Sequence, residues 1–319
     1  MSTIVLVHGI AQEQLAADIL ESQWLPALAG GVRNHGEPML ADRLWRGAAP
    51  GDLTVRMAYY GYHFIDEGTQ GAGGGPNDLD DLDPVAIEIV EELATRWLHT
   101  AAERASDNRD RREASRQLQE LPGSASDPDK DKPQGFRAAA RPAMNGLARL
   151  RWFAPFGMGL ADHFVYRALS QVSRYLADET IRSDAQDQVL ALIDSDTRLV
   201  IGHSLGSVVA YEALHRTGHP TALITLGSPL GLRNVIYERL RPQPTRVPAA
   251  VTRWDNLADH DDLVAAHLDL QPYFPPAAGA TVVPVTMASV DNGSKPHDAT
   301  HYLTKGVTGR IVTEVLTDG

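Results

Sequence analysis

Residues 197–216 read TRLVIGHSLGSVVAYEALHR and carry the strongest structural signal in the chain. Residues 199–201 (Leu-Val-Ile) form an apolar run that is too short for a helix and is typical of a buried parallel strand. The apolar residues after Gly206 suit a helix that packs on a sheet. Gly-His-Ser-Leu-Gly, with Ser204 at its centre, lies between them. The pattern is therefore strand, Gly-x-Ser-x-Gly, helix.

The spacing of the two glycines has a steric reason. In so tight a turn the serine adopts a strained backbone conformation, and side chains two residues before and after it would collide. The hydroxyl of Ser204 is then expected to project from the end of the sheet. The helix that follows directs backbone N–H groups and its positive dipole end at developing negative charge. The N–H of Leu205 is the predicted first donor to an oxyanion.

This stretch resembles the nucleophile elbow of the α/β-hydrolase superfamily, and its Gly-His-Ser-Leu-Gly form is similar to that of lipases and esterases. The resemblance covers most of the chain except residues 66–165. It implies an α/β-hydrolase fold, in which a mostly parallel sheet is flanked by helices. It also implies an oxyanion loop at His8-Gly9-Ile10, after a first strand over residues 3–7, with the N–H of Ile10 as the second donor.

Composition limits the remaining function classes. The chain has 319 residues, of which 43% are hydrophobic, so it can bury a large core. It contains no cysteine, which excludes a disulfide framework, a thiolate metal site and a cysteine nucleophile. The net charge of −12 and the lack of an evident basic face argue against nucleic acid as a partner.

The N-terminal residues suggest where the protein acts. They show no basic region, long apolar core or small-residue cleavage site, so no signal peptide is predicted. No apolar run approaches the length of a transmembrane segment. A cytoplasmic protein is therefore expected. The predicted chemistry requires no metal and no organic cofactor, and an oligomer is possible.

Several further elements are predicted from apolar spacing. Residues 14–29 indicate a helix that ends at Gly30-Gly31, and residues 53–64 alternate as a strand does. Three later apolar runs predict strands over residues 222–226, 249–255 and 281–287.

The carboxylate that would orient the catalytic histidine should follow the strand at 249–255, because the family order is serine, acid, histidine. This region offers Asp255, Asp259, Asp261 and Asp262. The Asp-Leu-Val-Ala sequence resembles the family's acid loop and favours Asp262. Asp259 is its main rival, and Asp261 is the third candidate.

The general base should lie between the last strand and the last helix. His297 lies there, and the Pro-His pair followed five residues later by Tyr-Leu is similar to esterase histidine loops. His301 is the alternative, although it falls inside the start of the helix. The histidines at positions 8, 63, 203 and 260 are interpreted as structural or as neighbours that support the site residues.

Residues 66–165 interrupt the predicted core, which comprises residues 1–65 and 166–319. The insertion is expected to be helical, with a helix over 84–104, a charged helix over 104–120 and a flexible segment at 122–135. Residues 147–165 are rich in apolar side chains, which suits either a lid over the site or a dimer interface or additional core.

The sequence thus predicts a serine hydrolase that cleaves carboxylic esters, with Ser204, His297 and Asp262 as a triad and an acyl-enzyme intermediate. A small-molecule or lipid acyl ester is the expected substrate. An acyltransferase or thioesterase acting through the same triad is the first alternative. A non-catalytic binding protein that keeps the fold is the second.

Overall fold

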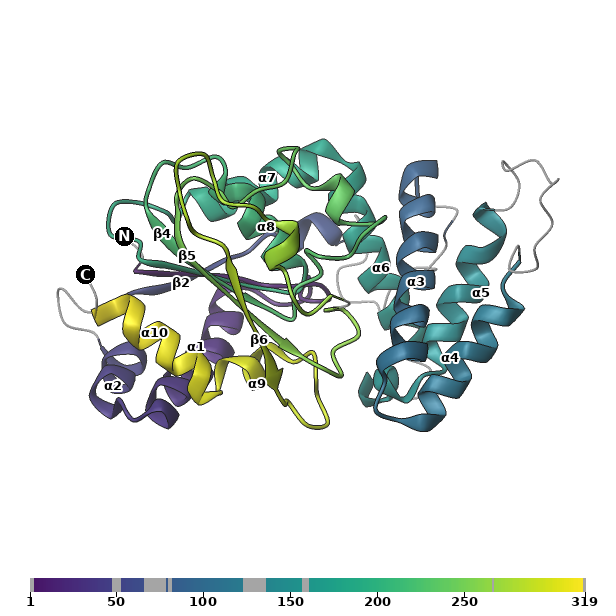
Figure 1. The fold of residues 1–319 in the computed structure, drawn as a ribbon, viewed down its shortest axis with the longest axis horizontal. Coiled ribbons are helices and arrows are strands. Elements are labelled where there is room, and N and C mark those ends of the chain that lie inside the picture. The colour runs from purple at the N-terminus through teal and green to yellow at the C-terminus, as the bar shows by residue number, and fades with distance from the viewer. Residues whose placement is uncertain are drawn as a thin grey trace. The chain divides into compact units, whose positions relative to one another are not determined.

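The computed structural model of the chain describes residues 3–47, 53–65, 79, 82–122, 136–156, 161–265 and 267–317. The chain divides into two compact units, of which the first comprises Met1–His63 and Arg182–Gly319 and the second Phe64–Ile181 (Figure 1). The predicted insertion at 66–165 falls within the second unit. That unit extends further, to Ile181, because the helix α6 (Ala161–Ala177) belongs to it.

The first unit is built on a sheet of six parallel strands in the order β2-β1-β3-β4-β5-β6. The strands are Ile4–Val7 (β1), Val55–Ala58 (β2), Leu199–His203 (β3), Thr221–Leu226 (β4), Val251–Asp259 (β5) and Pro284–Val290 (β6). The predicted α/β class, with a sheet flanked by helices, is confirmed. The strand order reverses between β1 and β3, and parallel sheets bind ligands at their carboxyl edge beside such a reversal.

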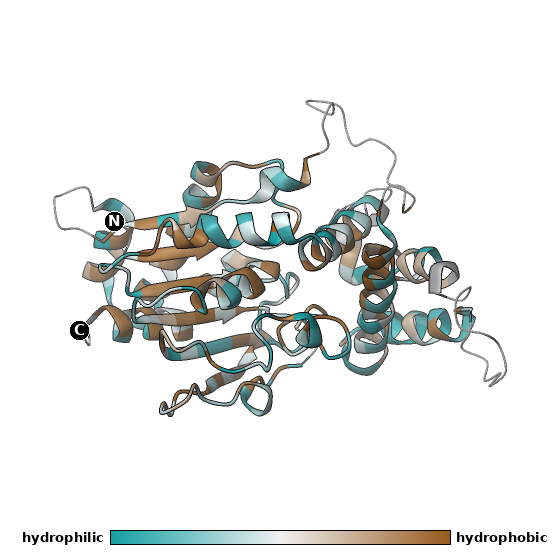
Figure 2. Ribbon diagram, turned by 90° about the horizontal axis from the view of Figure 1, so that it is seen from above, coloured by the Kyte–Doolittle hydropathy of each residue, from teal (hydrophilic) through white to brown (hydrophobic). Residues whose placement is uncertain are grey.

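Helices cover both faces of this sheet (Figure 1). One face carries α1 (Ala17–His35), α2 (Pro38–Arg46), α9 (Ala299–Leu303) and α10 (Gly306–Thr317), and the other carries α7 (Glu179–Leu190) and α8 (Leu205–Leu214). Ile4, Leu6 and Ile201 form a buried cluster with Leu28 of α1 and Ile311 of α10. Because both faces are covered, the strands are apolar along most of their length, and Figure 2 shows them largely in brown.

Helix α1 is longer than predicted. It continues through Gly30 and Gly31, where the sequence predicted its end, and stops before Gly36, whose φ is 110°. A Cβ on Gly31 would lie 2.1 Å from the carbonyl oxygen of Leu303, and a Cβ on Gly309 would lie 2.0 Å from the carbonyl oxygen of Gly31. The glycine at 31 therefore serves the close approach of α1 to α9 and α10, and the helix ends one turn later.

Strand β2 is shorter than predicted. It ends at Ala58, and the chain then forms a 3-10 helix over Gly61–Phe64 (η1). The N–H of Tyr60 donates to Nε2 of His8, at 3.2 Å, and so does not extend the ladder. The His8 side chain, in the loop after β1, thus accepts the hydrogen bond that the next backbone pair of the sheet would otherwise form.

The described part of the second unit is helical. It contains α3 (Pro84–Arg104), α4 (Asn108–Glu120), α5 (Phe136–Ala148), a 3-10 helix at Arg151–Phe156 (η3) and α6. The helices predicted at 84–104 and 104–120 correspond to α3 and α4. Leu150 and Phe153, from the predicted lid, are buried. The rest of that lid includes residues 157–160, which lie outside the described residues, as does nearly all of the predicted flexible segment 122–135. Short 3-10 helices in the first unit span Tyr237–Arg239 and Gln271–Tyr273.

A buried ion pair connects α7 to α8. The guanidinium of Arg182 binds both carboxylate oxygens of Glu212, with Nε 2.8 Å from Oε2, and only 2% and 1% of the two side chains is exposed. Glu212 also accepts from the side-chain amide of Gln186 (2.9 Å) and from the N–H of Arg241 (2.9 Å). Arg182 donates to the carbonyl of Arg239 at 2.6 Å. Removing one partner would leave the other charge buried and unbalanced.

We expect Arg182→Met to lower the free energy of unfolding by about 3–5 kcal/mol, because Glu212 would lose its counter-charge in the interior. Arg33→Met is the matched control. Arg33 pairs with Asp42 at 2.7 Å, but these side chains are 42% and 43% exposed, so the loss should be about 1 kcal/mol or less. Urea denaturation measures both. Arg182→Met combined with Glu212→Leu should recover part of the stability, and equal losses in the two single variants would contradict this interpretation.

Candidate active site

Ser204 occupies the turn between β3 and α8, as predicted. Its backbone angles are φ 54° and ψ −130°, a strained conformation for a residue with a side chain. The two glycines of the motif allow neighbouring backbone atoms to approach the turn closely. A Cβ on Gly202 would lie 2.7 Å from the carbonyl oxygen of Gly206, and a Cβ on Gly206 would lie 2.3 Å from the carbonyl oxygens of Val7 and His8. Larger residues at either position would force the turn apart.

The structure brings together the three side chains that the sequence singled out. Ser204 Oγ lies 3.0 Å from Nε2 of His297, and Nδ1 of His297 lies 2.8 Å from Oδ2 of Asp262. Ser204 follows β3, Asp262 follows β5 and His297 follows β6, so all three lie at the carboxyl edge of the sheet. The serine and the aspartate are buried, and the histidine side chain is 14% exposed.

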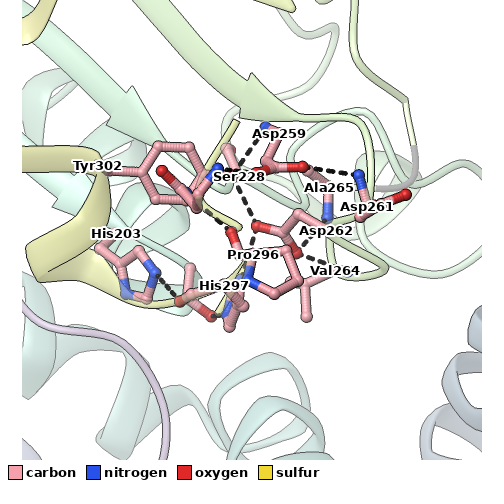
Figure 3. Close-up of polar contacts among 12 residues, drawn as sticks. His203, Ser228, Asp259, Asp261, Asp262, Val264, Ala265, Pro296, His297 and Tyr302 are labelled. Atoms are coloured by element: carbon pink, nitrogen blue, oxygen red, sulfur yellow. Dashed lines mark hydrogen bonds and ion pairs between the residues drawn. The ribbon is translucent and has the colours of Figure 1, made fainter. Parts of the chain in front are cut away.

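Hydrogen bonds to both carboxylate oxygens hold Asp262 as an anion (Figure 3). Oδ1 accepts from the N–H groups of Val264 (3.0 Å) and Ala265 (3.4 Å), and Oδ2 accepts from His297 and from the hydroxyl of Tyr302 (2.9 Å). Burial alone would raise the pKa of Asp262. The facing His297 and the bonds from His297 and Tyr302 outweigh burial, so the pKa lies below its usual value. A charged carboxylate fixes the Nδ1–H tautomer of the imidazole.

The other candidates have different partners. Asp259 accepts from the N–H groups of Asp261 (2.8 Å) and Asn292 (2.5 Å), so it connects two loops, and burial raises its pKa. Asp255 pairs with Arg253 at 2.6 Å. Nδ1 of His301 lies 2.9 Å from the carbonyl oxygen of Asn292. Among the described contacts of these acids, the hydrogen bond to His297 is made by Asp262.

The predicted oxyanion loop lies against the serine. A Cβ on Gly9 would lie 2.6 Å from the Cβ of Ser204. Because Nε2 of His8 accepts from the N–H of Tyr60, the proton of this neutral ring is on Nδ1, which donates to the carbonyl of Gly9 at 2.8 Å. Within the described residues, the N–H groups of Ile10 and Leu205 donate to no other group. Both remain available for a bound oxyanion.

His203 and Tyr302 support His297 and Asp262. From the sequence, His203 is either structural or supporting, and Tyr302 is assigned no such role. Nε2 of His203 donates to the carbonyl oxygen of His297 at 2.8 Å, and the two ring centroids lie 4.6 Å apart. Tyr302 donates to Asp262 and accepts from the N–H of Asp259 at 2.8 Å. His203 stands in the Gly-x-Ser-x-Gly motif, but no local signal shows that it reaches a residue 94 positions away.

Comparisons of the chain with protein-family models, with curated proteins and with solved structures found no match. Within the described ranges, no helix is long and apolar enough to cross a membrane. The same part of the chain holds no cluster of three or more histidine, aspartate or glutamate side chains suited to a metal ion.

Two buried histidines at this site are expected to make the protein less stable in acid. Burial lowers the pKa of His8 to about 4 and that of His203 to about 3, from an ordinary value of 6.5. Since the unfolded chain binds more protons below this ordinary value, the free energy of unfolding should fall as the pH drops from about 6.5 towards 4. The slope should reach at most about 1.4 kcal/mol per pH unit for each histidine.

Urea denaturation of the wild type and of His203→Gln between about pH 7 and pH 5 checks this expectation. Glutamine keeps a side-chain donor for the carbonyl of His297 but does not titrate. The variant should therefore lose about 2 kcal/mol of the total change in the free energy of unfolding between about pH 7 and pH 5. An unchanged slope would contradict the assignment of His203 as a neutral buried group.

Proposed function

We propose that the chain is a serine hydrolase with the α/β-hydrolase fold and that it cleaves carboxylic esters. The observation that carries the proposal is the hydrogen-bonded series Ser204–His297–Asp262, with the serine in a strained turn between a parallel strand and a helix. A serine, a histidine and a buried carboxylate in this order and geometry have a clear chemical use, because together they make a hydroxyl nucleophilic.

The reaction begins when Oγ of Ser204 attacks the carbonyl carbon of the ester and its proton passes to Nε2 of His297. Asp262 stabilises the imidazolium that forms. The N–H groups of Leu205 and Ile10 bind the negative oxygen of the tetrahedral intermediate, usually the largest single contribution in such sites. The intermediate collapses, His297 gives its proton to the departing alcohol, and an acyl-enzyme remains. Water, deprotonated by His297, then releases the acid and frees Ser204.

An acyl ester of a small molecule or a lipid is the proposed substrate. An acyltransferase or a thioesterase is the alternative, since either would use the same three residues. An acyltransferase differs from the proposed hydrolase in the acyl acceptor, and a thioesterase differs from it in the leaving group. A hydrolase gives only free acid when an alcohol is added, whereas an acyltransferase gives a new ester.

Two measurements on the wild-type protein test the proposal. A fluorophosphonate probe should become attached to Oγ of Ser204 with loss of fluoride, and peptide mass spectrometry identifies the labelled residue. A series of p-nitrophenyl esters with increasing acyl length should be hydrolysed with one optimum length. If the probe labels nothing and no ester is cleaved, the binding-protein alternative replaces the hydrolase. If the probe labels another serine, the assignment of Ser204 is wrong.

A further inference from the structure

The carbonyl of Ser204 receives two hydrogen bonds from one residue. The N–H of Ser207 lies 2.9 Å from this oxygen, and the hydroxyl Oγ of Ser207 lies 2.6 Å from it. The N–H contact is ordinary for the first turn of a helix. The hydroxyl is an additional, fully buried donor on the same acceptor.

The hydroxyl of Ser207 is itself hydrogen-bonded to a second hydroxyl. Oγ of Ser228, on the loop after β4, lies 2.7 Å from Oγ of Ser207. A carbonyl can only accept, so the one hydroxyl proton of Ser207 is directed to Ser204. Ser228 must therefore donate to Ser207. Ser228 in turn accepts from the N–H of Leu230 at 3.3 Å. The buried series runs from Leu230 through Ser228 and Ser207 to the carbonyl of Ser204.

This carbonyl belongs to the peptide unit whose N–H is that of Leu205. In a trans peptide the C=O and the N–H point in opposite directions, so a group that holds the oxygen also fixes the direction of the N–H. Hydrogen bonds in series polarise one another, and a peptide that accepts at its oxygen becomes a stronger donor at its nitrogen. Ser207 therefore acts on the proposed oxyanion donor from the side opposite to the substrate.

The other proposed donor is held in the same way. Nδ1 of His8 donates to the carbonyl of Gly9, and the N–H of that peptide unit is the one of Ile10. Both proposed oxyanion peptides thus have a buried side-chain donor on their carbonyl oxygen. The two donors come from different parts of the chain, and these two hydrogen bonds go to backbone carbonyl oxygens and not to the triad side chains.

We infer that Ser207 is a positioning residue that orients and polarises the Leu205 N–H, and that Ser228 acts through it. The inference rests on the proposed function. Neither serine touches the reacting atoms. Their contribution appears only when negative charge develops on the substrate oxygen. Removing either hydroxyl should therefore lower kcat and leave KM nearly unchanged.

The test compares an ester with the thionoester of the same acid, in which sulfur replaces the carbonyl oxygen. Sulfur is a weak hydrogen-bond acceptor, so the thionoester gains less from an oxyanion donor. Ser207→Ala is expected to lower kcat for the ester about 10-fold and kcat for the thionoester much less. A merely structural role would lower both rates equally.

Ser228→Ala is the second variant, and it removes only the outer hydroxyl. It should give a smaller loss on the ester, about 3-fold, with the same preference for ester over thionoester. Because Ser228 acts through Ser207, the double variant should behave as Ser207→Ala does. If Ser207→Ala does not fold, the ester-selective loss in Ser228→Ala still decides the matter.

Ser173→Ala is the matched control. Its hydroxyl is also fully buried and also donates to a carbonyl three residues earlier, that of Ser170, at 2.9 Å in α6. This variant should keep both rates. The inference is overturned by equal losses on the two substrates, by no loss, or by additive effects of Ser207→Ala and Ser228→Ala. Failure of the proposed function is recognised separately, because the wild type would then neither bind the fluorophosphonate probe nor cleave the ester.

Discussion

Replacing Ser204 by alanine is expected to lower kcat for ester hydrolysis by about 10⁴–10⁶-fold. The hydroxyl is the group that would become covalently bound to the acyl chain, and its hydrogen bond to Nε2 of His297 is the path by which its proton would leave. Alanine keeps the Cβ and so preserves the packing of the turn against Gly9. Steady-state assays with the best p-nitrophenyl ester measure the loss, and the variant should no longer react with a fluorophosphonate.

The same variant separates chemistry from folding. Both residues have a Cβ and meet the same strain at φ 54°, so the free energy of unfolding should change by about 1 kcal/mol or less. A variant that remains folded but keeps more than about one hundredth of the wild-type kcat would show that another residue is the nucleophile.

The serine and the histidine could be predicted because their signals are local. The glycines at 202 and 206 follow from the tight turn, and the structure shows the backbone contacts that exclude a Cβ at both. His297 lies on the loop between the last strand and the helices that follow, whereas His301, its alternative, falls inside α9. The parallel strands could be predicted from their apolar runs because helices cover both faces.

The acid could not be selected with the same clarity, because four aspartates lie within eight residues of each other. The choice depends on where β5 ends. It continues to Asp259, beyond the predicted end at 255, and its register with β6 shifts between Leu257 and Asp259. These features depend on pairing with a distant strand, which no local pattern shows. The bonds from Tyr302 to Asp262 and from Ser228 to Ser207 are also contacts between distant parts of the chain.

The role of the Gly30-Gly31 pair could not be predicted from the sequence either. Gly30-Gly31 has the appearance of a helix end, yet the pair lies inside α1, because the partner surface is the backbone of α9 and α10. The sequence alone does not distinguish a glycine that ends a helix from a glycine that permits close packing. They differ in what lies opposite, and that is decided by tertiary structure.

Asp262→Asn is expected to lower kcat by about 10³–10⁴-fold. Asparagine has nearly the same shape and can still accept from the N–H groups of Val264 and Ala265. It lacks the charge that would stabilise a protonated His297, and its amide can donate to Nδ1, which would place the imidazole proton on Nε2 and prevent that atom from accepting from Ser204. Activity on the p-nitrophenyl ester measures the loss, and KM should change little.

Asp261→Asn is the matched control, since it is the neighbouring aspartate and makes the same change of charge. Its carboxylate faces His260 at 3.3 Å, and its side chain is 36% exposed. We expect its kcat to remain within about 2-fold of the wild type. A large loss in this variant together with a small loss in Asp262→Asn would move the role of the acid to Asp261. A large loss in Asp262→Asn alone would support Asp262, whose carboxylate is hydrogen-bonded to His297, as the acid that assists Ser204.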